Sequence, residues 1–125
     1  MKVYLAARFG ERPLMEVHAD RIKAAGIEVT ASWVYGEEDG LTREDIATLD
    51  LNDVDRCDTL ISFTHPRGKL MTAGGGRHVE FGYALAKGKR MVVIGPRENV
   101  FHHTPGVEVF ATLDEWLASV EAAAA

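Results

Sequence analysis

Three consecutive glycines stand directly before a predicted helix that carries an acidic residue. Gly74, Gly75 and Gly76 place backbone N–H groups without side-chain obstruction at the start of that helix, where a phosphate binds readily. Glu80 falls in the first turn of the helix predicted over Arg77–Ala86, on the side that faces the glycines. A carboxylate there suits covalent catalysis. The alternatives are a flexible loop for the glycines and an acidic residue that only complements the helix dipole for Glu80.

Two further side chains have types and positions that suit the same chemistry. Asp50 lies four residues after Ile46 and four before Val54, so it interrupts the apolar stripe of a helix. The alternative is that this helix is rotated and Asp50 is half exposed. Tyr4 stands in the first predicted strand, where a tyrosine is most often a core residue whose hydroxyl reaches the rim.

Basic and imidazole side chains surround the glycine run in the sequence. Arg8 and Arg77 fall where a phosphate would arrive, although solvated surface charge is the ordinary role of such residues. Histidines occur in predicted loops or at a helix start, without the spacing of a zinc-binding helix. These histidines are His65, His78, His102 and His103. We therefore predict no metal site.

The elements that must position these residues alternate between strand and helix. Hydrophobic periodicity and turn residues predict strands over Lys2–Ala6, Ile27–Val34, Asp58–Phe63, Arg90–Ile94 and Val107–Phe110. Helices are predicted over Pro13–Ala25, with Leu14, His18, Ile22 and Ala25 as the apolar face, from Thr42 to Arg56, over Arg77–Ala86, and from Thr112 onward. Residues 64–76 form a long predicted loop.

This alternation predicts an α/β fold: a Rossmann-like or flavodoxin-like three-layer domain, with a five-stranded parallel sheet and helices on both faces. Ligands bind such sheets at the carboxyl ends of the strands. The loops after the first, third and fourth strands hold most of the unusual residues, so the site is expected there. The polar loop YGEEDG after the second strand is a candidate cover for it.

Length and composition limit the class of protein. With 125 residues the chain is predicted to be one domain, residues 1–125, and its formal charge of −5 disfavours a nucleic-acid polymer as partner. A single cysteine, Cys57, excludes an internal disulfide and is typical of a reducing compartment. The sequence contains no apolar run of membrane-spanning length. A cytoplasmic protein without a membrane partner is therefore expected.

Three segments together resemble a known family. They are KVYLAARF near the start, DLNDVDRCDTLISF in the middle and GGGRHVEFGYALAKGKRMVVIG after it, within residues 1–97. This order is similar to that of the nucleoside 2-deoxyribosyltransferase superfamily, which includes deoxynucleoside 5′-monophosphate N-glycosidases and cytidylate N-glycosidases. The most specific parts are Gly-x-x-x-Glu-x-Gly-x-Ala from Gly76 to Ala84 and the pair Asp50-Leu51.

The resemblance implies a role for three residues. Glu80 matches the nucleophile that attacks C1′ of the sugar, Asp50 the aspartate that assists proton transfer and orients the sugar, and Tyr4 the tyrosine that positions the nucleophile. The implied reaction is retaining cleavage of an N-glycosidic bond of a nucleoside or nucleoside 5′-monophosphate, with water or a second base as acceptor. No cofactor is implied.

The sequence departs from the family at two positions near the nucleophile. Gly74 stands where transferases commonly have aspartate and monophosphate N-glycosidases have serine, and His78 stands where the latter tend to have glycine. Arg8, Arg77 and His78 are therefore our candidates for phosphate contacts. Family members complete their sites across subunits, so a homodimer or larger homo-oligomer is expected, with Asn99, at the start of the segment 99–103, as a substrate-binding candidate.

Two other functions remain open on the sequence. The fold could serve a non-catalytic nucleotide-binding or sensor module, although the joint presence of Tyr4, Asp50 and Glu80 argues against this. The other alternative is an NAD glycohydrolase of related architecture. Base release that depends on Glu80 would separate the first of these from an N-glycosidase, and release of nicotinamide would indicate the second.

Overall fold

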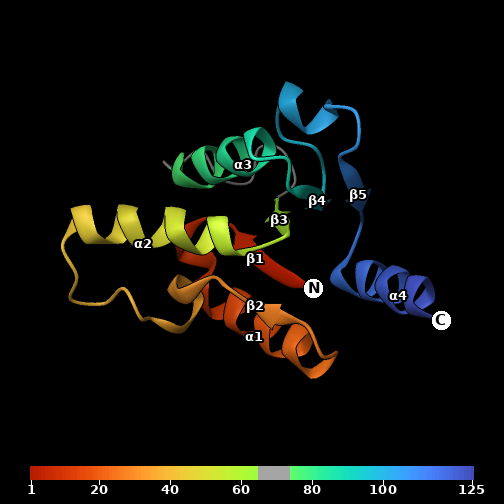
Figure 1. Cartoon of the computed structure of the whole chain (residues 1–125), viewed down its shortest axis with the longest axis horizontal. Helices are drawn as coiled ribbons and strands as arrows, with labels where there is room; N and C mark the ends of the chain where they lie inside the picture. Colours follow the sequence, from red (N-terminus) through yellow and green to blue (C-terminus); the bar gives the residue numbers. More distant parts are fainter. Residues whose placement is uncertain (65–73) are drawn as a thin grey trace.

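The computed structural model describes residues 1–64 and 74–125 and has the predicted architecture (Figure 1). All strand pairs are parallel, and the sheet order is β2-β1-β3-β4-β5. This is the flavodoxin-like order, in which the chain reverses its direction of winding between β1 and β3. The carboxyl ends of these two strands are therefore the expected place for a ligand.

The described elements follow one another as β1 (Lys2–Ala6), η1 (Phe9–Glu11), α1 (Arg12–Ala24), β2 (Glu28–Val29), η2 (Ser32–Tyr35), α2 (Arg43–Arg56), β3 (Thr59–Phe63), α3 (Gly76–Ala86), β4 (Arg90–Ile94), η3 (Val100–His103), β5 (Glu108–Phe110) and α4 (Leu113–Ala124), where η denotes a 3-10 helix. The predicted N-caps of two helices are confirmed. Thr42 accepts a hydrogen bond from the backbone of Asp45, and Thr112 accepts one from Glu115.

Helices cover both faces of the sheet, with α2 and α3 on one side and α1 and α4 on the other (Figure 1). On one face, the Tyr83 hydroxyl of α3 donates to the Asp55 carboxylate of α2. On the other, Arg21 of α1 pairs with Asp114 of α4, and His18 stacks on Phe63 of β3. The three-layer prediction is confirmed.

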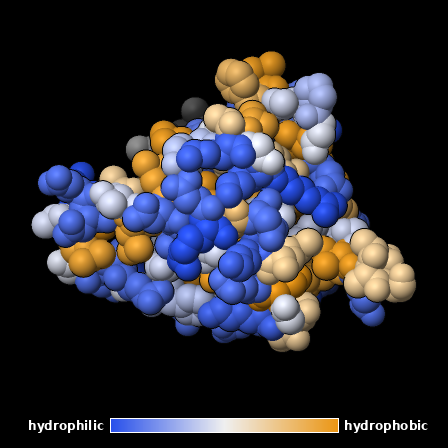
Figure 2. All heavy atoms as spheres, in the orientation of Figure 1, coloured by the Kyte–Doolittle hydropathy of each residue, from blue (hydrophilic) through white to orange (hydrophobic). Residues whose placement is uncertain are grey.

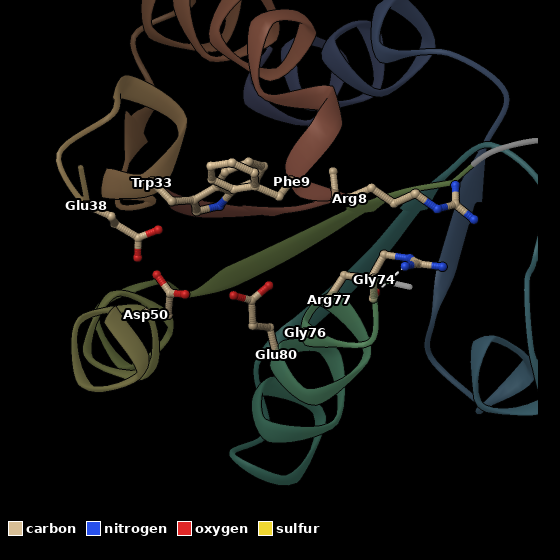
Figure 3. A pocket seen from close by; sticks show the side chains of 10 residues that line it. Arg8, Phe9, Trp33, Glu38, Asp50, Gly74, Gly76, Arg77 and Glu80 are labelled. Atoms are coloured by element: carbon tan, nitrogen blue, oxygen red, sulfur yellow. Dashed lines mark hydrogen bonds between the residues drawn. The ribbon is translucent and has the colours of Figure 1, made fainter. Parts of the chain in front are cut away.

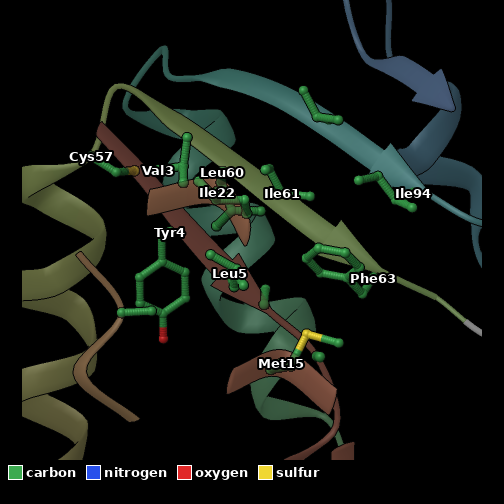
Figure 4. Close-up of a cluster of buried hydrophobic side chains, with 14 of the residues drawn as sticks. Val3, Tyr4, Leu5, Met15, Ile22, Cys57, Leu60, Ile61, Phe63 and Ile94 are labelled. Atoms are coloured by element: carbon green, nitrogen blue, oxygen red, sulfur yellow. The ribbon is translucent and has the colours of Figure 1, made fainter. Parts of the chain in front are cut away.

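The core consists of apolar residues from the central strands and the inner faces of the helices (Figure 4). Leu60, Ile61 and Val92 are fully buried, as expected for parallel strands that are covered on both sides. Cys57 is buried at the end of α2, and burial raises the pKa of its thiol to about 11, which fits an unreactive core cysteine.

The second strand is much shorter than predicted. Only Glu28 and Val29 pair with β1, and the chain then turns into η2 instead of continuing as a strand to Val34. Two contacts draw it away from the sheet edge: the Trp33 indole donates to the Leu5 carbonyl at 2.9 Å, and the Ser32 N–H donates to the Asp53 carboxylate at 2.9 Å. The alternating pattern of residues 27–34 was therefore a misleading strand signal.

The buried face of α1 also differs from the prediction. Met15, Ala19 and Ile22 are buried, whereas Leu14 and Ala25 are exposed. The helix is rotated by about one residue, so that Met15 rather than Leu14 enters the core. No described helix is both long and apolar enough to cross a membrane.

The visible surface is mostly polar, with apolar side chains gathered at the top of the view, over the segment between β4 and β5 (Figure 2). That segment contains η3, whose Val100 and Phe101 are exposed.

Candidate active site

A cavity of about 150 Å³ lies at the carboxyl ends of β1 and β3, the position that the topology indicates (Figure 3). The lining residues come from the loop after β1, from η2 and the loop that follows it, and from the two helices α2 and α3. They are Ala7, Arg8, Phe9, Trp33, Glu38, Asp50, Gly74, Gly76, Arg77 and Glu80. Segments far apart in the sequence thus converge on one small space.

Glu80 and Tyr4 form the centre of this site. Tyr4 is fully buried in β1, and its hydroxyl donates a 2.6 Å hydrogen bond to Glu80 Oε2. Glu80 is the fifth residue of α3 because the helix begins at Gly76, so it lies in the second turn rather than the predicted first. This position weakens the alternative in which Glu80 only complements the helix dipole, an effect confined to the first turn.

Burial dominates the electrostatics of Glu80. It raises the pKa of the carboxyl to about 8, while the Tyr4 hydrogen bond lowers the pKa and the charges of Asp50 and Asp53 raise it. Burial and the Glu80 charge in turn raise the pKa of Tyr4, so the phenol stays a hydrogen-bond donor. A carboxyl group that lies in a cleft and has a pKa raised toward neutral pH is typical of catalytic carboxylates.

Basic side chains occupy one end of the cavity. Arg8 and Arg77 have side-chain exposures of 12% and 7%, and both approach Glu98, at 3.5 Å and 3.4 Å between Nη2 and Oε2. Among the described residues, none accepts a hydrogen bond from Arg8 Nε or Nη1, although both atoms are buried. Two guanidinium groups therefore share one carboxylate, which leaves a net positive charge and free donors for an anion.

The three glycines have different roles. A Cβ on Gly74 would come within 2.6 Å of Arg77 Nη1 and 3.3 Å of Arg8 Cγ, so any larger residue would force the end of the Arg77 side chain to shift. Gly76 lines the cavity beside Glu80, while Gly75 is the exposed N-cap of α3. The predicted phosphate cradle is thus a helix start flanked by two arginines. Residues 65–73 of the predicted loop, including His65, lie outside the described residues.

Acidic side chains occupy the opposite end of the cavity, where Glu38 and Asp50 face each other (Figure 3). Glu38 is only 7% exposed. Asp50 is partly buried on α2, as the half-exposed alternative expected, and it also lines the cavity. Sequence reasoning missed Glu38. Its only signal was the loop YGEEDG, in which nothing distinguishes Glu37 from Glu38.

An aromatic wall lies beside the acidic end. Phe9 is 66% exposed although it lines the cavity, and its ring centroid is 6.3 Å from that of Trp33. An exposed aromatic ring at the mouth of a cleft offers a surface on which a planar ligand can stack. Phe9, Trp33 and Glu98 were also missed by the sequence analysis.

Four predicted residues do not line this cavity: Gly75, His78, Asn99 and Tyr4, which lies behind Glu80. His78 and Asn99 contact each other, with 3.5 Å between Nδ1 and Nδ2, and both line a separate hollow of about 410 Å³ with Phe81 and Phe101. His78 lies two residues from Glu80, which turns it through about 200° to the other side of α3. Within one chain, neither residue is placed to contact a ligand on Glu80.

A second hollow, of about 390 Å³, adjoins the cavity and shares Asp50, Gly76 and Glu80 with it. Its other lining residues lie on α2 and α3 and include Arg43, Ile46 and Val79. The space around Glu80 is thus larger than the cavity alone. Within residues 1–64 and 74–125, no group of three His, Cys, Asp or Glu side chains is arranged to hold a metal ion.

Solved structures share this architecture. The CMP N-glycosidase BcmB of Clostridium botulinum superposes with a TM-score of 0.66 at 21% identity, over 98% of this chain and 99% of that one. A 2-deoxyribosyltransferase from Leishmania mexicana superposes with a TM-score of 0.59 at 19% identity, over 90% of this chain and 75% of that one. These two likenesses establish the fold. Neither a family model nor a curated protein matches the sequence.

Proposed function

We propose that the protein belongs to the nucleoside 2-deoxyribosyltransferase superfamily and cleaves the N-glycosidic bond of a nucleoside or nucleoside 5′-monophosphate through a covalent glycosyl-Glu80 intermediate. The observation that carries this proposal is the Tyr4–Glu80 hydrogen bond at the centre of a cavity with one basic and one acidic end. A nucleotide has the matching order of groups: an anionic phosphate, a sugar carbon that becomes electrophilic, and a base that leaves.

The first step forms a bond between a Glu80 carboxylate oxygen and C1′ as the bond from C1′ to the base nitrogen breaks. The electron pair of the broken bond leaves with the base, which takes a proton from the acidic end of the cavity, where Asp50 lies. The ionised carboxylate stabilises the positive charge that develops on the sugar. Tyr4 holds the attacking carboxyl in place and favours its ionised form.

In the second step the acceptor attacks C1′ and Glu80 leaves as a carboxylate. With water as acceptor, the proton lost by water returns to Asp50, and the enzyme is restored to its initial state. A second base as acceptor gives transfer instead. The likeness to a CMP N-glycosidase agrees with water as the acceptor, and the likeness to a 2-deoxyribosyltransferase agrees with a second base.

The basic end supports a 5′-phosphate on the substrate. Arg8 has two buried nitrogens available to an anion, and Arg77 and the start of α3 stand beside it. Arg8→Ala should reduce kcat/KM for a nucleoside 5′-monophosphate by about 10- to 100-fold and leave the corresponding nucleoside unaffected. Arg97→Ala is the matched control because Arg97 is exposed in the next loop. Equal losses on both substrates would contradict a phosphate role for Arg8.

A homo-oligomer in the cytoplasm fits the remaining surface features. Val100 and Phe101 are exposed, and Phe101 lines the hollow that contains His78 and Asn99. A neighbouring subunit that covers this area would bury them, and it gives the segment 99–103 a route into a partner's site. The lone buried Cys57 fits a reducing compartment.

The experiment is base release by the purified protein from ribo- and deoxyribonucleosides and their 5′-monophosphates, with and without an added free base. Release from at least one substrate, abolished by Glu80→Gln and retained by the exposed control Glu16→Gln, is the expected result. Exchange only with an added base would make the protein a transferase. Release of nicotinamide from NAD alone, or no release from any substrate, would contradict the proposal and favour the glycohydrolase or the binding module.

A further inference from the structure

Glu38 is a buried carboxyl that the reaction described above does not use. It lies in the loop between η2 and α2, and this loop is held in one shape by a turn at Gly36 (φ +76°) and by the 3.1 Å ion pair between Arg12 and Asp39. The Leu41 N–H donates to the Glu38 carbonyl at 3.1 Å. The loop therefore directs one acidic side chain into the cavity and leaves its neighbour Glu37 exposed.

The Glu38 and Asp50 carboxyls face each other, and each retains an unused oxygen. Across the described part of the chain, neither Glu38 Oε2 nor Asp50 Oδ1 receives a hydrogen bond from any N–H or O–H group, although both atoms are buried. Ionised carboxylates are acceptors only, so the two can bond to each other only when one of them carries a proton. A buried polar atom without a partner is costly, which indicates that a ligand completes this end of the cavity.

The electrostatics of the pair favours one shared proton. Burial and hydrogen bonding to Asp50 raise the pKa of Glu38 to about 8, with smaller contributions from the charges of Asp50, Glu80 and Asp53. Burial also raises the pKa of Asp50, whereas its hydrogen bond with Glu38 lowers it. Near neutral pH the pair therefore holds one proton and one negative charge.

This arrangement is rich in acceptors and poor in donors. Arg8 and Arg77 lie at the other end of the cavity (Figure 3), and the indole N–H of Trp33 is used by the Leu5 carbonyl. Arg43 borders the adjoining hollow, which Asp50 also lines, but not the cavity that contains Glu38. Two carboxyl groups that share one proton present at most one donor to a ligand, and their remaining oxygens are acceptors.

We propose that Glu38 and Asp50 together form the subsite for the leaving base and select a base edge in which an amino group stands beside an unprotonated ring nitrogen. The amino hydrogens are donated to the carboxylate oxygens, and the ring nitrogen accepts the shared proton. A base with carbonyl oxygens at that edge brings lone pairs against the carboxylates and is disfavoured. This inference rests on the proposed function, since it assigns the base of that reaction.

The test measures binding of CMP, UMP, AMP and IMP by calorimetry, in a Glu80→Gln background that prevents turnover. CMP and UMP differ in an amino group against a carbonyl, as do AMP and IMP. We expect each amino nucleotide to bind about 10-fold or more tightly than its carbonyl counterpart. Glu38→Gln adds a side-chain NH2 donor, so it should reverse or abolish this preference, while the control Glu37→Gln in the same loop should retain it.

The outcomes separate this inference from the proposed function. No amino preference, no binding of any nucleotide, or a preference unchanged by Glu38→Gln would overturn the role of Glu38. A reversed preference that Glu37→Gln does not produce supports it, and an unfolded variant cannot imitate such a reversal. Base release by the wild-type protein is measured separately: release without amino preference overturns only the subsite, and amino preference without release overturns only the glycosidase.

Discussion

Asp53 and the group of acidic residues around the cavity have opposite surroundings, although Asp53 lies only about one turn from Asp50 on α2. Asp53, on α2, is 1% exposed, and its carboxylate accepts hydrogen bonds from the Ser32 N–H at 2.9 Å and from Arg56 Nη2 at 2.6 Å. The Thr30 hydroxyl donates to the Asp53 carbonyl at 2.8 Å. Asp53 thus joins α2 to the end of β2 and the start of η2.

The second group, formed by Glu38, Asp50 and Glu80, surrounds the cavity and has few internal partners. Tyr4 donates a hydrogen bond to Glu80, but within the described residues no group donates one to Glu38 Oε2 or Asp50 Oδ1. A carboxylate whose oxygens accept hydrogen bonds from the protein stabilises the fold. A carboxylate with an unpartnered buried oxygen lowers stability and is available to a ligand. The comparison predicts that substitutions in the two groups affect different properties.

The largest expected effect is on catalysis. Glu80→Gln should lower base release by at least ~10³-fold because it removes the nucleophile. It should leave thermal stability at pH 7 unchanged or higher, since a neutral amide replaces a buried carboxyl. Chromatography of the released base and a thermal melt check both parts. If the melting temperature of Glu80→Gln fell by several degrees along with its activity, Glu80 would belong with the carboxylates that stabilise the fold.

The pH dependence of stability is the next largest effect. Because the folded pKa of Glu80 is raised from 4.5 to about 8, the folded state binds its proton more tightly than the unfolded state. Stability from this group is therefore complete below pH 4.5 and is lost as the pH rises toward 8, with a slope of up to about 1.4 kcal/mol per pH unit. Denaturant titrations from pH 5 to 8 should give a falling free energy of unfolding, and Glu80→Gln should make this fall smaller, while Glu38 keeps its own contribution. The same slope in wild type and Glu80→Gln would refute this assignment, and Glu16→Gln is the control.

Asp53→Asn should affect stability rather than chemistry. It weakens the charged hydrogen bond that a half-exposed Arg56 donates to a carboxylate only 1% exposed, so the free energy of unfolding should fall by about 1 to 3 kcal/mol. The rate per folded molecule should stay within about two-fold of wild type, because Asp53 does not line the cavity. Asp45→Asn, on the exposed side of the same helix, is the control. A folded, stable Asp53→Asn protein without activity would break the distinction between the two groups.

The smallest expected effect comes from Tyr4→Phe. Loss of the hydroxyl removes the hydrogen bond that lowers the pKa of Glu80, so the acidic limb of the kcat/KM profile should move to higher pH. At pH 7 we expect a loss of about 10-fold. Tyr35→Phe, which removes a hydroxyl bonded to Asp20 at the surface, should leave the profile unchanged. An unshifted acidic limb in Tyr4→Phe would mean that Tyr4 does not tune the nucleophile.

The fold was largely predictable because its signals are local. The apolar run Arg90–Ile94 matched β4 residue for residue, and the caps Thr42 and Thr112 marked their helices. The error at residues 27–34 arose because the contacts of Trp33 with Leu5 and of Ser32 with Asp53 are long-range. A pattern of neighbouring residues in the sequence does not reveal such long-range contacts.

The site was predictable only in part, for a related reason. Tyr4, Asp50 and Glu80 were found because they belong to sequence motifs that resemble those of a known family. Glu38 was not, because its burial depends on the turn at Gly36 and on the pairing of Arg12 with Asp39. Glu98 was missed as well, since its role appears only when Arg8, from the loop after β1, and Arg77, from α3, meet it.

The central claim is that Glu80 forms a covalent bond to the sugar, and intact-protein mass spectrometry tests it most directly. The wild-type protein is incubated with 2′-fluoro-substituted nucleoside 5′-monophosphates, in which the fluorine slows release of the sugar from the enzyme, and is quenched in acid. The account predicts an added mass of one sugar phosphate, located by peptide mapping on Glu80 and absent from Glu80→Gln. Base release without any adduct, or an adduct on another residue, would contradict it.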